Sequence, residues 1–218
     1  MTRTSFLAAI ALTFSLSACA SYDLATRSVA ELDFAGAGNV LALPSLHVVD
    51  TSITVPRTLK VSEANSYYPM GDIVWRGEAY GDRHAQIEAI LRDSMAMATT
   101  GQSGARAAVV DITLHRFHAL TEKTRYSVGG VHTIRFDLTF RDPATGQALA
   151  PTQTIRADLK GYGGDRAMQA ERAGLTQRVR ITHHLANVIR AELTRPGSMG
   201  GNRGVTQLVA GLETNAPL

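Results

Sequence analysis

The residue types that most often carry catalysis or bind metals do not form a recognised constellation in this chain. His115 and His118 stand three positions apart in a segment that alternates like a β-strand, so their side chains should face opposite sides and would not share a metal ion. His183 and His184 are adjacent, and neither a His-Glu-x-x-His zinc motif nor a Gly-x-Ser-x-Gly nucleophile elbow occurs. We therefore expect no catalytic residue, no metal and no cofactor. A hydrolase site assembled from residues far apart in the sequence stays an open alternative.

The segment Gly161-Tyr162-Gly163-Gly164-Asp165 is the best candidate for an anion-binding loop. A dinucleotide loop needs a third glycine where Arg166 stands, and a P-loop needs a Gly-Lys-Ser/Thr sequence that does not occur here. The carboxylate of Asp165 would also repel a phosphate at that position. We interpret the segment as a corner between a strand and a helix, with Asp165 as the helix cap.

Cys19 is the only cysteine and carries the strongest chemical signal in the chain. Arg3 and an apolar run over residues 6–14, too short to span a bilayer, precede it. Leu16, Ser17 and Ala18 stand directly before it, and this order resembles the bacterial lipoprotein box. The resemblance implies that residues 1–18 are a signal peptide. It also implies a lipid anchor on Cys19, comprising a diacylglyceryl thioether and an N-terminal fatty acid such as palmitate.

The lipoprotein resemblance implies localisation to the cell envelope, with the chain facing the periplasm. Ala20 follows the anchor, whereas an Asp at this position favours retention in the inner membrane in the best-studied sorting systems, so the outer membrane is favoured. A lone exposed thiol would be reactive in an oxidising compartment, and acylation of Cys19 removes that problem. The formal net charge of +3 is too small to predict nucleic-acid binding.

The remaining sequence divides into a tether, one domain and a tail. Residues 19–39 lack a steady period and predict an acylated tether, and residues 40–195 predict a periplasmic domain. Residues 196–218 begin with several glycines, after which Val205, Leu208, Val209 and Leu212 form a short helical stripe. This segment either docks on the domain or folds against a partner.

Within the domain, the apolar patterns predict two strands, a helix, a three-strand meander and a second helix, in that order. Short strands are expected near residues 46–50 and 72–76, and a three-strand meander over 108–114, 133–141 and 154–162. Helices are expected after the caps Asp82 and Thr176. The fold class is therefore α+β, with an antiparallel sheet of about four to five strands and two main helices packed on one face.

Three residues are candidates for contact with a partner or a lipid. Trp75 is the only tryptophan, and it could equally be a core aromatic, since an indole ring suits both places. Arg76 beside it and Tyr162 in the glycine-rich corner are the other two candidates.

The order of motifs resembles the PqiC-like auxiliary lipoproteins of ABC-type lipid transport systems and, more loosely, the LptE-like lipoproteins of lipopolysaccharide assembly. The segments that carry this resemblance are residues 110–117 and the hairpin over 135–147. Residues 75–83 and 176–181 are also similar to an uncharacterised bacterial lipoprotein family, which has no activity to carry over.

The resemblance implies a non-enzymatic, membrane-anchored accessory to envelope lipid or lipopolysaccharide transport. It would dock on an envelope protein, such as a component of an ABC-type transporter, or shield an acyl chain between its sheet and helices. The alternative is a structural or regulatory lipoprotein that binds an envelope assembly such as the cell-wall synthesis machinery.

Overall fold

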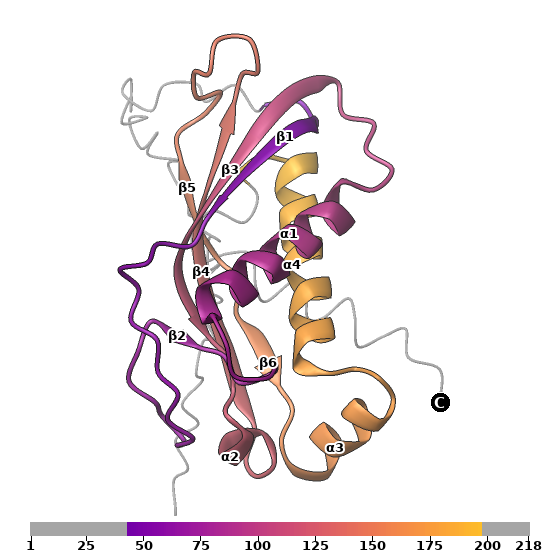
Figure 1. The fold of residues 1–218 in the computed structure, drawn as a ribbon. Helices are drawn as coiled ribbons and strands as arrows, with labels where there is room; N and C mark the ends of the chain where they lie inside the picture. The colour runs from indigo at the N-terminus through magenta and orange to yellow at the C-terminus, as the bar shows by residue number, and fades with distance from the viewer. Residues whose placement is uncertain (1–42, 198–218) are drawn as a thin grey trace, which may run out of the picture. The chain divides into compact units, whose positions relative to one another are not determined.

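The structure is a computed structural model that describes residues 43–197 (Figure 1). The predictions for the signal peptide, Cys19, the tether and the segment 205–212 lie outside the described residues. No helix within residues 43–197 is long and apolar enough to cross a membrane.

The described residues form a mixed six-stranded sheet with its two long helices on one face (Figure 1). The main strand order is β1 (Leu46–Thr54), β3 (Arg106–His118), β4 (Gly130–Arg141) and β5 (Gln153–Arg156). Two short strands complete the sheet, since β2 (Ile73–Val74) pairs with β3 and β6 (Leu159–Gly161) pairs with β4. The predicted α+β class with two helices packed on the sheet is confirmed.

The sheet differs from the prediction in the direction of its first two strands. Strands β3, β4, β5 and β6 are antiparallel, as the meander predicted, but β1 and β2 both run parallel to β3. The chain leaves β1, passes through β2 and helix α1 (Arg83–Thr99), and then enters β3. Such a crossover returns the chain to the starting end of the sheet, which makes the two joined strands parallel.

The third strand of the predicted meander is interrupted. Strands β5 and β6 both pair with β4, and residues 157–158 separate them. At the break, the Asp158 carboxylate accepts a hydrogen bond from the backbone N–H of Ile134 at 3.2 Å. The side chain thus replaces the backbone acceptor that a continuous strand would offer.

Both predicted caps of the long helices are confirmed. Asp82 accepts from the backbone N–H of Ala85 at the start of α1, and Thr176 accepts from that of Val179 at the start of α4 (Gln177–Thr194). The expected cap at Asp165 is wrong, because helix α3 (Gly164–Arg172) begins after Gly163 and Asp165 lies within its first turn. The one-turn helix α2 (Glu122–Arg125) was not predicted.

Apolar side chains fill the space between the sheet and the helices α1 and α4. One face of β3 and β4 packs on the apolar stripes of both helices to form a single buried cluster. Its fully buried members include Ile87, Leu91, Ile112, Leu114, Ile134, Phe136, Ile181 and Leu185. An acyl chain could enter between these layers only if they separated, so the structure gives no support to shielding of a lipid there.

Candidate functional site

The candidate site is a groove of about 430 Å³ at the end of β3, on the face of the sheet away from α1 and α4. One wall is the loop over residues 67–69, and the other is the turn that leads from α2 into β4. We call it the Tyr68 groove, and its lining residues are Tyr67, Tyr68, Pro69, Arg116, His118, Ala119, Leu120, Thr121, Thr124, Val128, Gly129, Gly130, Val131 and Thr133. This lining combines aromatic and aliphatic side chains with three threonines, His118 and the cation of Arg116, and it has no carboxylate.

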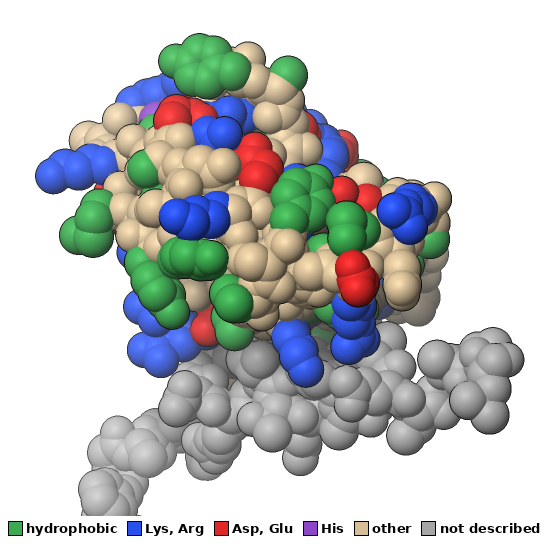
Figure 2. All heavy atoms as spheres, turned by 90° about the horizontal axis from the view of Figure 1, so that it is seen from below, with side chains coloured by type: hydrophobic (Ala, Val, Ile, Leu, Met, Phe, Trp, Pro, Cys, Tyr) green, Lys and Arg blue, Asp and Glu red, His purple; other side chains and the backbone are tan. Residues whose placement is uncertain are grey.

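Large apolar side chains project into solvent at the rim of the groove. Tyr68 and Met70 are each 90% exposed, Val128 is 76% exposed, and Val131 is half exposed. Hydrophobic side chains gather on the lower end of the domain, with Lys and Arg side chains around them (Figure 2). A cluster of exposed apolar residues with a polar border is typical of a binding surface.

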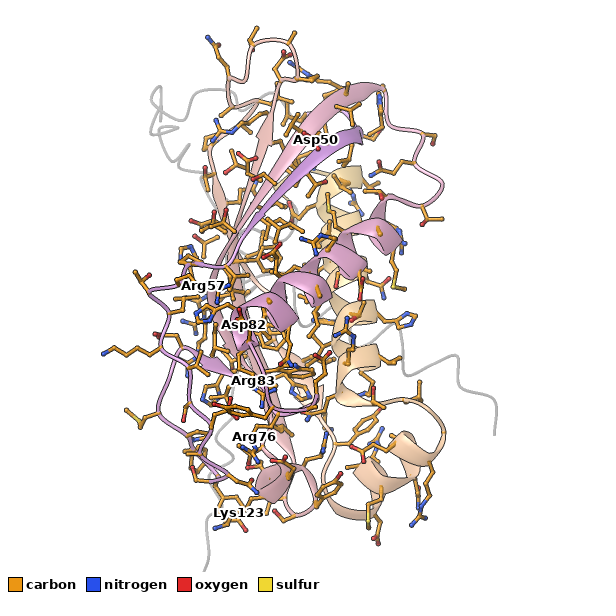
Figure 3. The ribbon with its side chains drawn as sticks, viewed as in Figure 1. Asp50, Arg57, Arg76, Asp82, Arg83 and Lys123 are labelled. Atoms are coloured by element: carbon orange, nitrogen blue, oxygen red, sulfur yellow. The ribbon has the colours of Figure 1, made fainter. Side chains whose placement is uncertain are left out.

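Partly buried ion pairs hold the loop that carries Tyr67 and Tyr68. Arg83 is 4% exposed, and its guanidinium donates to both carboxylate oxygens of Glu63, at 2.6 and 3.0 Å. Arg76 joins the same network, since it donates to the backbone carbonyl of Glu63 at 2.7 Å and to the carboxylate of Glu122 at 2.5 Å. Figure 3 labels both arginines beside the start of α1.

These ion pairs also favour the charged form of Glu63. The hydrogen bond from Arg83 is the main cause that lowers the pKa of the Glu63 carboxyl, and it outweighs the opposing effect of burial. Glu63 is therefore ionised at neutral pH and stays paired with its arginines. The network fixes the position of the chain at Glu63, four residues before Tyr67.

Helix α2 holds the same loop from the other side. The Thr121 hydroxyl donates to the carbonyl of Ser66 at 2.8 Å, and the backbone N–H of Lys123 donates to the Asn65 side chain at 2.9 Å. The Lys123 ammonium also lies 4.8 Å from the centre of the Tyr67 ring. Contacts within the chain therefore hold the groove wall in place without a bound partner.

None of the three contact residues expected from the sequence lines this groove. Trp75 is fully buried and packs edge-on against Phe117 with ring centres 5.7 Å apart, so the structure places it in the core and leaves it no surface for a partner. Arg76 is engaged in the ion-pair network. The ring of Tyr162 lies between Arg180 and Arg166, whose guanidinium carbons are 3.5 and 4.2 Å from its centre.

A second cavity, beside Tyr162, is too small to be a substrate site. Its volume is about 10 Å³, enough for a single water. His132 lines it and is fully buried, with its Nδ1 accepting from the backbone N–H of Leu120 at 3.3 Å. Burial lowers the pKa of His132 to about 3, so this histidine is neutral and structural at physiological pH.

The other histidines with candidate spacing take separate partners. The His115 Nε2 lies 2.9 Å from the Asp137 carboxylate, and the His118 Nε2 lies 3.0 Å from the carbonyl of Pro69. Between residues 43 and 197 no three His, Cys, Asp or Glu side chains are grouped to hold a metal ion.

Sequence reasoning missed the groove because its two walls come from loops far apart in the chain. The available signal was Tyr67-Tyr68-Pro69-Met70, a run of large side chains inside a connecting segment that otherwise reads as polar. Two adjacent tyrosines in such a segment favour a binding role over a packing role.

Comparisons with known proteins give a family but no activity. No curated protein matches the sequence. A candidate lipoprotein from Caulobacter crescentus is 16% identical with a TM-score of 0.31, covering 49% of this chain and 80% of that chain. A Xanthomonas campestris protein assigned to DUF330 is 13% identical with a TM-score of 0.39, covering 79% of this chain and 89% of that chain. These similarities are too distant to support a conclusion about function.

A family model covers most of the domain and extends beyond α4. It is described as a family of unknown function, DUF6778, and it matches residues 46–207. The matched region includes every strand and helix of the described fold. The chain belongs to the DUF6778 family.

Proposed function

We propose that this protein is a lipid-anchored periplasmic lipoprotein that acts, without enzymatic activity, as an accessory to envelope lipid or lipopolysaccharide transport. The Tyr68 groove is its contact surface. The observation that carries this proposal is the exposure of Tyr68, Met70 and Val128 beside a groove that has no carboxylate in its lining. Such a surface suits binding, because its one histidine, His118, lies 3.0 Å from the Pro69 carbonyl and the lining has no carboxylate to act with it on a substrate.

The anchor supports the same proposal from the sequence. Leu16, Ser17 and Ala18 before Cys19 resemble a lipoprotein box, and an anchored domain meets only partners within reach of its membrane. A component of an ABC-type transport system is the protein partner that the resemblance implies. The alternative partner is a cell-envelope assembly that the protein supports or regulates.

Photocrosslinking in living cells tests the proposal. A photoreactive amino acid replaces Tyr68 in the lipidated protein, and the matched control carries it at His183, an exposed position on α4 on the other side of the sheet. We expect position 68, but not position 183, to capture phospholipid or a transport component.

Two results would speak against this assignment. Capture of cell-wall machinery from position 68 would favour the structural or regulatory alternative. Equal capture from positions 68 and 183, or capture from 183 alone, would show that the groove is not the contact surface.

A further inference from the structure

Three arginines form a row across the outer face of the sheet. Arg116 on β3 lies directly opposite Arg135 on β4, and Arg135 lies directly opposite Arg156 on β5. Residues directly opposite in antiparallel strands point to the same side. That side faces away from α1 and α4, because the flanking Ile134 and Phe136 belong to the core beneath those helices.

Within the described residues, no carboxylate pairs with the arginines of this row. Within the described part of the chain, none of the three guanidinium groups forms an ion pair or a hydrogen bond, although Arg141 on the same face pairs with Asp111. The nearest carboxylate along β4 is that of Asp137, which already binds His115 at 2.9 Å and Thr154 at 2.7 Å. Like charges directly opposite each other destabilise a sheet, and an external anion would relieve that repulsion.

The arginine row is continuous with the Tyr68 groove. Arg116 belongs to both, and Val131 and Thr133 line the groove from the same face of β4 as Arg135. Lys160 on β6 lies opposite Val131 and adds an exposed cation to this border. The outer face therefore combines unpaired cations with projecting aromatic and aliphatic side chains.

We propose that this outer face docks on an anionic phospholipid bilayer. The guanidinium groups of the row bind lipid phosphates, which match their planar donors, while Tyr68 and Val128 enter the headgroup layer. The proposal rests on the proposed function, since a chain anchored at Cys19 meets the bilayer at a high effective concentration. That tether favours a membrane over an acidic protein as the source of the phosphate-like charge.

Vesicle co-sedimentation tests the docking. The mature chain, residues 19–218, carries Cys19→Ala so that no acyl chain holds it on the membrane. We expect it to bind vesicles of phosphatidylethanolamine with phosphatidylglycerol, and to bind poorly to phosphatidylcholine vesicles. Each arginine near an anionic surface contributes about five-fold to partitioning. Arg135→Gln should therefore weaken binding about five-fold, and the triple variant at 116, 135 and 156 about 100-fold.

The control variant is Arg92→Gln, which removes an exposed arginine from α1 on the other side of the sheet and should leave vesicle binding unchanged. Circular dichroism establishes that each variant is folded. Equal binding to the anionic and the neutral vesicles, or a triple variant that binds like the parent, would overturn the proposal.

The two proposals fail in different ways. If the protein ignores anionic vesicles but position 68 crosslinks to a transport protein in cells, the bilayer is the wrong partner and the accessory function stands. If the protein binds anionic vesicles and position 68 captures cell-wall machinery, the membrane docking is supported and the transport role is contradicted.

Discussion

Arg135 lies between two other arginines on an exposed strand face, and this position has a consequence for stability. Because its neighbours Arg116 and Arg156 carry the same charge, Arg135→Thr should raise the free energy of unfolding by about 0.2–1 kcal/mol. Threonine also suits a strand position. Urea denaturation would measure the change. The matched variant is Arg141→Thr, which loses the ion pair with Asp111 and should not be stabilised. A destabilised Arg135→Thr variant would show that the row does not repel itself.

His132 makes the stability of the domain depend on pH. Its pKa is about 3 in the folded chain, against 6.5 for an unperturbed histidine, so between these values the unfolded chain binds a proton that the folded chain does not. The contribution of neutral His132 to the free energy of unfolding is complete above pH 6.5 and is lost as the pH falls toward 3. Between these two pKa values, the free energy of unfolding should fall by up to about 1.4 kcal/mol for each pH unit.

The comparison with His132→Asn isolates this effect in urea titrations at several pH values. Carboxyl groups with lowered pKa values, such as Glu63 and Asp137, also lose stability on acidification and contribute in both proteins. The parent should therefore lose stability more steeply than the variant as the pH falls below 6.5. Parallel curves would mean that His132 can be protonated within the fold.

At the scale of the elements, the start of α4 depends on one hydroxyl. Thr176 accepts from the backbone N–H of Val179, and the helix buries Ile181, Leu185 and Ile189 against the core. Thr176→Ala should lower the free energy of unfolding by about 1 kcal/mol, while Thr176→Ser keeps the acceptor and should stay close to the parent. Thermal denaturation of the three proteins measures this. Equal losses in both variants would locate the effect in the threonine methyl group.

The loop that carries Tyr68 depends on Arg83. Arg83→Met removes the hydrogen bonds to Glu63 and leaves that carboxylate without its main partner, which should cost about 2 kcal/mol. Arg57→Met is the control, since Arg57 is 69% exposed in its pair with Asp82 and should contribute less than about 1 kcal/mol (Figure 3).

Hydrogen exchange distinguishes a local effect of Arg83 from a global one. In Arg83→Met, the amides of residues 62–70 should exchange faster, while those in the centre of β3 and β4 should follow only the loss in global stability. Unchanged exchange over 62–70 would show that the hydrogen bonds from α2 are sufficient to hold the groove wall.

At the scale of the whole molecule, local signals predicted the two long helices and the antiparallel direction of the meander, but not helix α2 or the break between β5 and β6. The alternation in β4 and the caps Asp82 and Thr176 depend on neighbouring residues, and each was found where expected. The direction of β1 depends on the crossover through α1, which no local pattern contains. The groove depends on contacts between residues 65–69 and α2, such as the bond from Thr121 to Ser66, and sequence spacing does not specify such contacts.

The arginine row could not be predicted from the sequence for a related reason. Arg116, Arg135 and Arg156 are ordinary outward-facing strand residues when each is taken alone. Only the register of β3, β4 and β5 aligns them, and a bulge between Leu114 and Arg116 adjusts that register. A charge pattern that crosses several strands can therefore be recognised only when the pairing register of the sheet is known.

The most direct test of the account is the accessibility of the outer face in the membrane-anchored protein. Cys19 is the only cysteine and would be acylated, so a cysteine introduced by Tyr68→Cys, Val128→Cys or His183→Cys would be the only free thiol. Maleimide labelling rates are compared between envelope membranes and the same variants released by Cys19→Ala. We expect positions 68 and 128 to label more slowly in membranes and position 183 to label equally in both states. Equal rates at 68 and 128, or protection of 183 alone, would contradict the proposal that the protein works through the Tyr68 groove.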